Sequence, residues 1–247
     1  MSIGGGLSSV ERCGETVRRG VGDWTLTVHE LLRHLDRVGF AGAPLPLGLE
    51  RGVEILTFVA GGEATHSDEE LTRVGQLIRA FHTASRSFVA PAGARWQFMV
   101  GAPRDGSVIC HNDLSPDNTV YQPPGVPRAF IDWDLAAPAP PLWDFAWAAY
   151  RFVPLYDDAT CERLGYPSGG QAERLRIMSD AYGLEERDAL LPAVCQRISV
   201  LYETARVWGG DEGRPGWRDV WRDTRGEQWL RGLRHVKTKS DEWQRAL

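Results

Sequence analysis

The sequence predicts a two-lobed α+β protein, with a small strand-rich lobe followed by a larger, mostly helical lobe. Short β-prone runs dominate the first 62 residues, apart from one amphipathic helix. Helical patterns rich in aromatic residues fill most of the chain after residue 143. A Gly-Gly pair at 61–62 interrupts an apolar run between the two regions. We therefore predict lobes at residues 1–62 and 63–247.

Local patterns predict the elements of the first lobe. Two β-prone runs, 10–12 and 16–19, flank a Cys-Gly-Glu turn and form a hairpin. Apolar residues at helical spacing predict a helix over 27–38, which Thr27 and Glu30 would open as a capping box and Gly39 would end. The segment GAPLPLGLE is predicted to be a loop. The run VEILTFV, residues 53–59, is predicted to be a buried strand.

The second lobe opens with another capping box, Ser67 with Glu70, at the start of an amphipathic helix that runs through Phe81. Three short strands follow, two of which bracket the polar stretch HNDLSPDN at residues 111–118. Four helices complete the lobe. The predicted strands are 108–110, 119–121 and 129–131, and the predicted helices are 143–153, 171–181, 185–207 and 217–243.

Composition narrows the class of protein. Hydrophobic residues make up 43% of the chain and charged residues 25%, as in ordinary globular proteins. The net charge of -5 argues against general nucleic-acid binding and is compatible with a small cationic substrate. The four cysteines are scattered, no apolar run approaches the roughly 18 residues of a membrane span, and the first residues lack the apolar core of a signal peptide. We expect a cytoplasmic protein without membrane or nucleic-acid partners; no pattern indicates its oligomeric state.

A set of polar residues that follow one another in a fixed order is the candidate catalytic site of the chain. His111, Asp113 and Asn118 lie in one loop, Asp132 follows a predicted strand fourteen residues after Asn118, and Asp144 opens a helix. Phosphoryl transfer needs a carboxylate that orients and deprotonates a hydroxyl, with an amide oxygen and a second carboxylate to hold Mg²⁺. Any one of these residues alone is better explained as a turn or cap residue. The ordered set favours a phosphoryl-transfer site.

The stretches HNDLSPDN, IDWD and WDFA resemble the aminoglycoside phosphotransferase and choline kinase family, which are small-molecule kinases with a protein-kinase-like fold. The resemblance implies that Asp113 is the catalytic base and that Asn118 and Asp132 are the Mg²⁺ ligands. It implies supporting roles for His111 and Asp144 in the structure of the loop. Asp134 would make a second contact to metal or water.

The resemblance extends to the first lobe, where VEILTFVAGG is similar to a hinge strand. Backbone groups of Thr57, Phe58 and Val59 would then lie near the base of ATP or GTP. A turn at residues 4–9, GGGLSS, either covers the phosphates or is only a chain terminus.

The first lobe departs from the kinase pattern because its strand lysine is absent: the only lysines are Lys237 and Lys239. Arg18 or Arg19 must replace it, and only one of the two can face the cleft, since neighbours in a strand point to opposite sides. We slightly prefer Arg18. Glu30 points away from the apolar face of its helix, whereas His29 lies at the edge of that face and is better aimed at the cleft, where it would contact phosphate or bond locally.

These observations predict a Mg²⁺-assisted transfer of the γ-phosphoryl group of ATP or GTP to a hydroxyl of a small molecule, such as an aminoglycoside-like antibiotic or an amino alcohol. The alternative is a nucleotide-sensing or immunity protein that has the kinase fold but little transfer activity, as the missing lysine suggests. A metal-dependent hydrolase is a third possibility, but no second cluster of histidines or carboxylates supports it. No motif identifies the acceptor.

Overall fold

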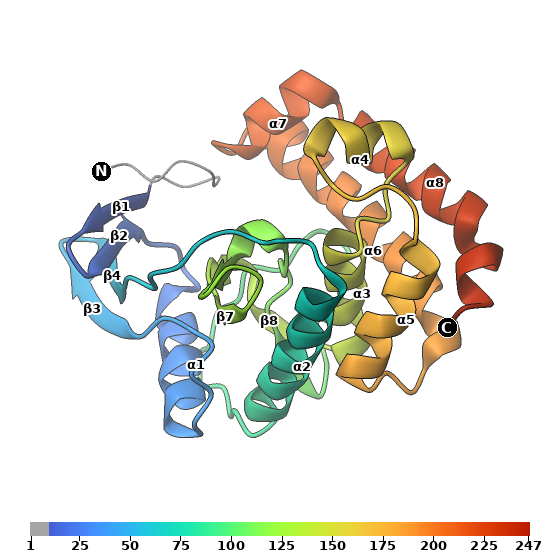
Figure 1. The fold of residues 1–247 in the computed structure, drawn as a ribbon. Coiled ribbons are helices and arrows are strands. Elements are labelled where there is room, and N and C mark those ends of the chain that lie inside the picture. Colours follow the sequence, from blue (N-terminus) through green and yellow to red (C-terminus); the bar gives the residue numbers. More distant parts are fainter. Residues whose placement is uncertain (1–9) are drawn as a thin grey trace.

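A four-stranded antiparallel sheet and one helix form the N-terminal part of the computed structural model, which describes residues 10–247 (Figure 1). The glycine-rich turn predicted at 4–9 lies outside the described residues. The strand order is β1-β2-β4-β3, and α1 (Thr25–Arg37) lies below the sheet in the view of Figure 1. The strands are β1 (Val10–Cys13), β2 (Thr16–Gly20), β3 (Pro46–Glu50) and β4 (Val53–Thr57).

Two local predictions in this lobe are wrong. The segment GAPLPLGLE is not all loop, because Pro46–Glu50 pairs with β4 at the edge of the sheet; proline is tolerated there as the first residue of an edge strand. The predicted capping box of α1 does not form either. The helix begins at Thr25, and Thr27 lies inside it, where its hydroxyl accepts a hydrogen bond from the Arg95 N–H at 2.9 Å.

The chain leaves the sheet at Thr57 and is fastened to the second lobe at Gly62. The Gly62 N–H donates to the Tyr121 carbonyl at 2.7 Å, and the Tyr121 N–H donates back to the Gly62 carbonyl at 3.3 Å. A side chain at Gly61 would collide with the Val120 side chain and the Tyr121 carbonyl, so the close approach of the two segments requires glycine.

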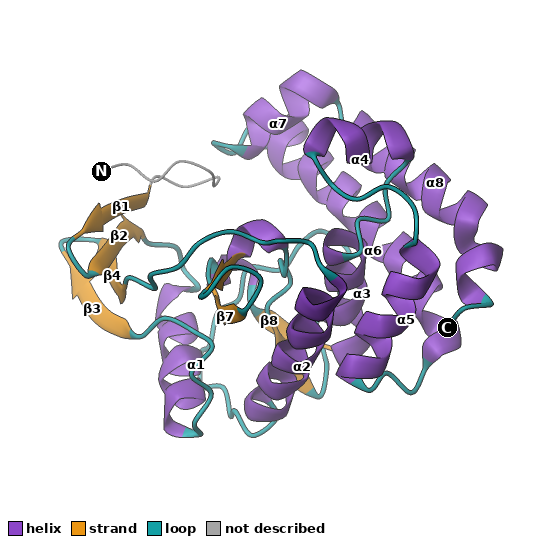
Figure 2. Cartoon of the chain, in the orientation of Figure 1, coloured by secondary structure: helices purple, strands orange, loops and turns teal. Residues whose placement is uncertain are grey.

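Helices make up most of the second lobe (Figure 2). As predicted, Ser67 caps α2: its hydroxyl accepts from the Glu70 N–H at 3.1 Å. The predicted helix 217–243 is instead two helices, because Arg225 and Gly226 both adopt positive φ between them. The helices are α2 (Asp68–Ser85), α3 (Pro141–Phe152), α4 (Asp158–Leu164), α5 (Gln171–Tyr182), α6 (Leu190–Ala205), α7 (Trp217–Thr224) and α8 (Glu227–Gln244).

Two small two-stranded antiparallel sheets hold the polar stretch between them. β5 (Val108–Cys110), which precedes the stretch, pairs with β8 (Ala137–Ala139), and β6 (Thr119–Tyr121), which follows it, pairs with β7 (Pro127–Phe130). The strands that bracket the stretch therefore pair with later segments rather than with each other. This pairing returns residues 131–136 to the side of the loop at 111–118.

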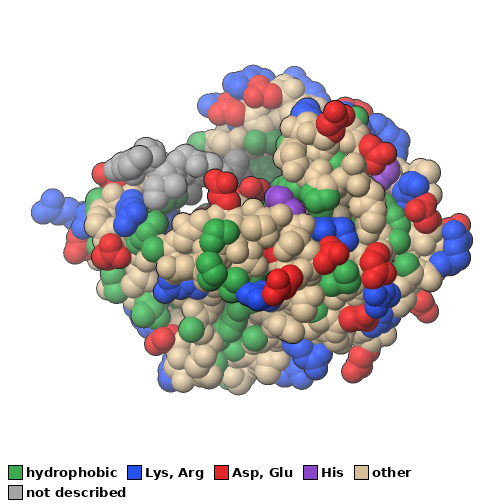
Figure 3. All heavy atoms as spheres, viewed as in Figure 1, with side chains coloured by type: hydrophobic (Ala, Val, Ile, Leu, Met, Phe, Trp, Pro, Cys, Tyr) green, Lys and Arg blue, Asp and Glu red, His purple; other side chains and the backbone are tan. Residues whose placement is uncertain are grey.

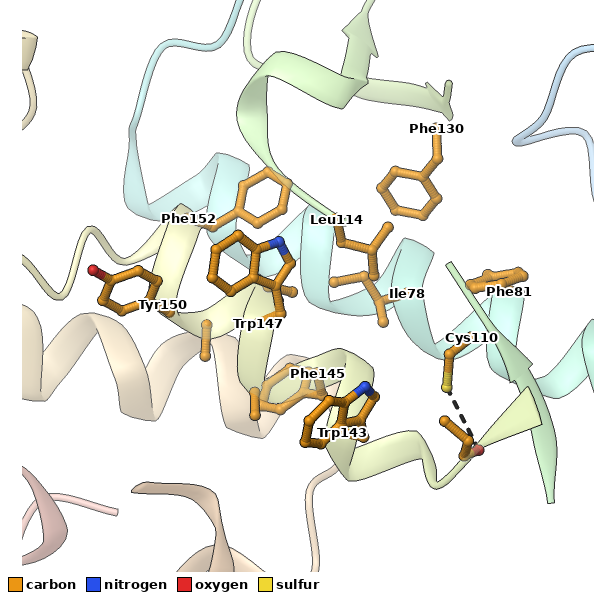
Figure 4. Close-up of a cluster of buried hydrophobic side chains, with 14 of the residues drawn as sticks. Ile78, Phe81, Cys110, Leu114, Phe130, Trp143, Phe145, Trp147, Tyr150 and Phe152 are labelled. Carbon is orange, nitrogen blue, oxygen red and sulfur yellow. Dashed lines mark hydrogen bonds between the residues drawn. The ribbon is translucent and has the colours of Figure 1, made fainter. Parts of the chain in front are cut away.

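The core of the second lobe lies directly under this loop. Leu114 is completely buried and packs beside Ile78 of α2, with the aromatic residues of α3 close by (Figure 4). Acidic and basic side chains are interspersed over the face of the molecule seen in Figure 3. Among residues 10–247, no helix is long and apolar enough to cross a membrane.

Candidate active site

Asp144 anchors the loop that carries the predicted base. Its carboxylate accepts hydrogen bonds from the backbone N–H groups of His111 and Asn112, both at 2.8 Å, and lies 3.1 Å from His82 Nε2. Burial opposes ionisation of this fully buried group, but the hydrogen bond from His82 and the charges nearby outweigh it, so the pKa of Asp144 is lowered. An ionised side chain on α3 thus fixes the start of the loop, where Asn112 adopts φ 65°.

His111 ties the loop to the segment that follows β7. Its Nε2 donates to the Ile131 carbonyl at 3.0 Å, and its Nδ1 accepts from the Asp113 N–H at 3.3 Å. This pair of partners requires a neutral ring protonated on Nε2. Burial lowers the pKa of His111, which favours the same neutral form.

Both oxygens of Asp113 are held by defined donors. Trp147 Nε1 donates to Oδ1 at 3.1 Å, and Asn118 Nδ2 donates to Oδ2 at 2.8 Å. Burial raises the pKa of Asp113, with a smaller contribution from Asp132 in the same direction. A carboxylate with a raised pKa accepts a proton more readily than an ordinary aspartate, which suits a general base.

Asn118 and Asp132 are brought together by a backbone contact, in which the Ile131 N–H donates to the Asn118 carbonyl at 2.9 Å. The side-chain amide of Asn118 donates to Asp113, and its Oδ1 accepts no hydrogen bond from residues 10–247. Asp132 adopts φ 64° at the end of β7, and its Oδ1 accepts from Arg19 at 2.9 Å. One amide oxygen and one carboxylate oxygen therefore stay open at this corner, and such oxygens are the ligands that Mg²⁺ prefers.

Arg19 of β2 reaches across from the sheet and donates to three carboxylates. Its Nε donates to Glu54 of β4, and its two terminal nitrogens donate to Asp132 and Asp134. Only 7% of Arg19 is exposed. Burial alone would lower its pKa, but Asp134, Glu54 and Asp132 outweigh this effect and raise it. The guanidinium is therefore always charged, and it uses three of its five N–H donors within the protein.

His29 and Glu54 complete this buried cluster. His29 Nε2 lies 2.8 Å from Glu54 Oε1, and both side chains are 1% exposed. Burial would raise the pKa of Glu54, but the hydrogen bond from His29 and the charge of Arg19 lower it overall. Trp24 Nε1 donates to Asp134 at 2.8 Å from the start of α1. The sheet and α1 thus meet the second lobe through one connected polar network.

The slight preference for Arg18 as the inward arginine is wrong. Arg18 forms a surface ion pair with Glu50 at 3.3 Å, and Arg19 shares its face of β2 with Val17 and points into the cleft. Glu30 lies on the surface with Arg33, in keeping with its predicted phase. His29 faces inward as predicted, and of its two predicted roles the structure shows a contact within the protein, to Glu54.

Part of the predicted hinge is committed to contacts within the lobe. The Thr57 N–H donates to the Leu45 carbonyl at 2.9 Å, and the Phe58 N–H donates to the Glu15 carbonyl at 2.8 Å. The Val59 N–H has no partner within the described part of the chain. Of the three residues, only Val59 offers a free backbone donor for a nucleotide base.

Three residues of this network escape prediction from the sequence. Glu54 carried a usable signal, because it is a lone charge within the apolar run VEILTFV. Trp147 lies in the aromatic helix predicted at 143–153, and nothing in its pattern indicates that its indole N–H meets Asp113. Arg197 donates to the Asn112 carbonyl and lies over the Trp147 ring at 4.9 Å; burial lowers its pKa to about 10.

Comparison with known proteins identifies the family of the chain. A family model described as "Phosphotransferase enzyme family" matches residues 94–178, which include the loop, Asp132 and Asp144. The chain is 35% identical to the trifolitoxin immunity protein of Rhizobium leguminosarum bv. trifolii, over 95% of each chain. The chain belongs to the aminoglycoside phosphotransferase and choline kinase family.

Solved structures of this family share the fold. A microcompartment-associated aminopropanol kinase superposes with a TM-score of 0.61 at 14% identity, covering 96% of this chain and 90% of that one. A choline/ethanolamine kinase family protein from Mesorhizobium loti gives a TM-score of 0.55 at 18% identity, covering 96% and 92%. An ADP-bound aminoglycoside phosphotransferase gives 0.55 at 13% identity, covering 95% and 92%. The two-lobed, protein-kinase-like architecture predicted from the sequence is confirmed.

Proposed function

We propose that the protein transfers the γ-phosphoryl group of ATP or GTP to a hydroxyl group of a small molecule. The observation that supports this most directly is the convergence of Asp113, Asn118 and Asp132 in one corner between the lobes. Asp113 accepts hydrogen bonds through both oxygens, and Asn118 keeps its amide oxygen open beside Asp132. Such a reaction depends mainly on positioning and charge neutralisation, and these are what the arrangement supplies.

Each residue has a defined task in this proposal. Asp113 orients the acceptor hydroxyl and takes its proton, with its carboxylate held by Trp147 and Asn118. Asn118 Oδ1 and the second oxygen of Asp132 would hold Mg²⁺, which when bound neutralises charge on the phosphates. Arg19, which donates to Glu54, Asp132 and Asp134, would use its two remaining N–H groups to bind the phosphates in place of the absent lysine.

The test is turnover by a matched pair of variants. Asp113→Asn removes the base, whereas Asp117→Asn alters an exposed carboxylate of the same loop that pairs with Arg151. We expect wild type and Asp117→Asn to release ADP or GDP with at least one member of a panel of hydroxylated compounds, and Asp113→Asn to lose on the order of a hundredfold or more in kcat. Equal turnover by the two variants would remove Asp113 from the role of base.

A second candidate function is a kinase-fold immunity or nucleotide-binding protein with little transfer activity. Two observations favour it: Arg19 is ion-paired with Asp132 and Asp134, where a metal would otherwise bind, and the 35% identical relative is named an immunity protein. Calorimetry separates the two candidates. Binding of Mg·ATP without turnover on any hydroxylated compound or on trifolitoxin supports the second candidate, whereas turnover supports the first.

A further inference from the structure

A small pocket lies beside the predicted base, walled by α3, α4 and α8. Its volume is about 140 Å³, below the roughly 300–1,000 Å³ of pockets that hold drug-sized ligands. Aromatic side chains line much of it, among them Trp147, Tyr156 and Trp229. It therefore accommodates a small molecule, or one group of a larger one, against apolar walls.

Trp147 connects this pocket to the chemistry. Its ring lines the pocket, and its Nε1 donates to Asp113 at 3.1 Å. It projects from α3 near Tyr150, which also lines the pocket (Figure 4). Arg151, the next residue of α3, donates to Asp117 of the same loop at 2.7 Å. A molecule seated in the pocket would thus lie next to the loop that carries the base.

The charges around the pocket are predominantly positive. Three arginines line it, Arg151, Arg163 and Arg231, against one carboxylate, Asp157. Asp157 is already engaged: it caps α4 by accepting from the Thr160 N–H and hydroxyl at 3.1 and 2.8 Å. Its contact with Arg231 is loose, at 3.7 Å. Arg151 pairs with Asp117 outside the pocket and Arg231 pairs loosely with Asp157, so Arg163 carries the charge that is left without a carboxylate partner in residues 10–247.

Several donors at the pocket lack partners within the described chain. Arg163 forms no ion pair or hydrogen bond with residues 10–247. Arg151 has a buried Nε without a partner, although its terminal nitrogen meets Asp117. Unpaired guanidinium groups at a cavity are suited to bind carboxylate or phosphate, often with two parallel hydrogen bonds.

We propose that this pocket binds the acceptor substrate and that the acceptor carries an anionic group, a carboxylate or a phosphate, on a small planar or apolar body. The proposal rests on the proposed function, since it treats the pocket as the acceptor side of the same site. It departs from the cationic substrate with which the net charge of -5 was compatible. The local charge at the pocket is opposite to that of the whole chain, and three arginines would repel a polycation.

The test compares probes of similar size that share a phenyl group and differ in the charge of their polar end. Calorimetry of the full chain, without nucleotide, would measure binding of 3-phenyllactate, of its neutral amide and of the cationic amino alcohol phenylalaninol. A second pair, glycerate and glycerol 1-phosphate, separates a carboxylate from a phosphate preference. We expect the anionic probes to bind on the order of tenfold or more tightly than the neutral one, because hydrogen bonds to charged groups are the stronger ones.

Variants assign the effect to the pocket. Arg163→Gln and Arg231→Gln should each raise the Kd of the anionic probe on the order of tenfold and that of the amide less than twofold. Arg234→Gln is the control, because Arg234 is exposed on α8 and pairs with Glu227, and neither residue lines the pocket. The replaced side chains are exposed, so folding should be preserved, which circular dichroism checks.

Each outcome decides the question. If no anionic probe binds more tightly than its neutral or cationic counterpart, or if Arg234→Gln acts like Arg163→Gln, the proposal is overturned. Phosphoryl transfer is measured separately, with Mg·ATP and the same compounds. Transfer to neutral or cationic alcohols without anion preference refutes the pocket proposal alone, and anion preference without transfer to any compound refutes the proposed function alone.

Discussion

Replacement of Arg19 by glutamine should destabilise the protein strongly, because three carboxylates share this one guanidinium. Glu54 is 1% exposed, so its contact is a buried ion pair, and removing one partner of such a pair costs about 3–5 kcal/mol. The contacts to Asp132 and Asp134 are partly exposed and add less than about 1 kcal/mol each. Together these contacts amount to about 3–7 kcal/mol. Unfolding followed by circular dichroism should therefore show a Tm lower by roughly 6–28 °C, at about 2–4 °C per kcal/mol.

Arg18→Gln is the matched control, since Arg18 is the neighbour in β2 and its pair with Glu50 is exposed at 3.3 Å. This variant should lose at most about 1 kcal/mol in the free energy of unfolding. The difference between wild type and Arg19→Gln should also depend on pH. The pKa of Glu54 is lowered in the folded protein, so its stabilisation is present above its usual pKa and is lost as the pH falls through the folded value.

The gap between wild type and Arg19→Gln should therefore narrow in acid. Equal losses for the two arginine variants at pH 7, or a gap that stays constant as the pH falls below about 4, would refute the assignment of a buried ion pair.

Other predictions concern the loop and the metal corner. Asp144→Asn should lower the free energy of unfolding by about 1–3 kcal/mol. The backbone N–H groups of His111 and Asn112 donate to different oxygens of Asp144, and an amide has only one oxygen to accept them. Chemical denaturation would measure this loss. The pKa of Asp113 is raised, and only its ionised form accepts a proton. The kcat of wild type should therefore begin to fall, as the pH is lowered, at a pH above the usual pKa range of an aspartate. A pH profile of kcat would show this fall. Asp132→Ala should weaken Mg·ATP binding itself, by calorimetry, with affinity for nucleotide in EDTA nearly unchanged.

The second lobe could be predicted well because its signals are local. The capping residues Ser67 and Glu70 place the start of α2 correctly, and the order of His111, Asp113 and Asn118 defines a loop. The pairing of the strands around that loop could not be predicted. β5 finds its partner β8 more than twenty residues further along the chain, and strands as short as these carry no register signal strong enough to identify a partner.

The first lobe was harder because tertiary contacts decide its details. Thr27 fits a capping pattern, but α1 begins at Thr25 and the Thr27 hydroxyl bonds to a loop far along the chain. The choice between Arg18 and Arg19 depended on which face of β2 meets the second lobe, which strand alternation alone does not decide. Arg19 shares its face with Val17, so the apolar side of the strand is also the side that meets the carboxylates.

The two backbone hydrogen bonds between Gly62 and Tyr121 hold the connection between the lobes at one point. Asn118 immediately precedes the hairpin that Tyr121 belongs to, and Asp132 follows it, so the hairpin keeps these two residues at a constant separation. A rotation of the sheet about this point would change the distance between Arg19 and Asp132 without altering that separation. The position of the small lobe would then decide how far Asp132 is shared between the guanidinium and a metal ion, and the absence of a side chain at Gly61 allows the two lobes to stay in close contact at this point.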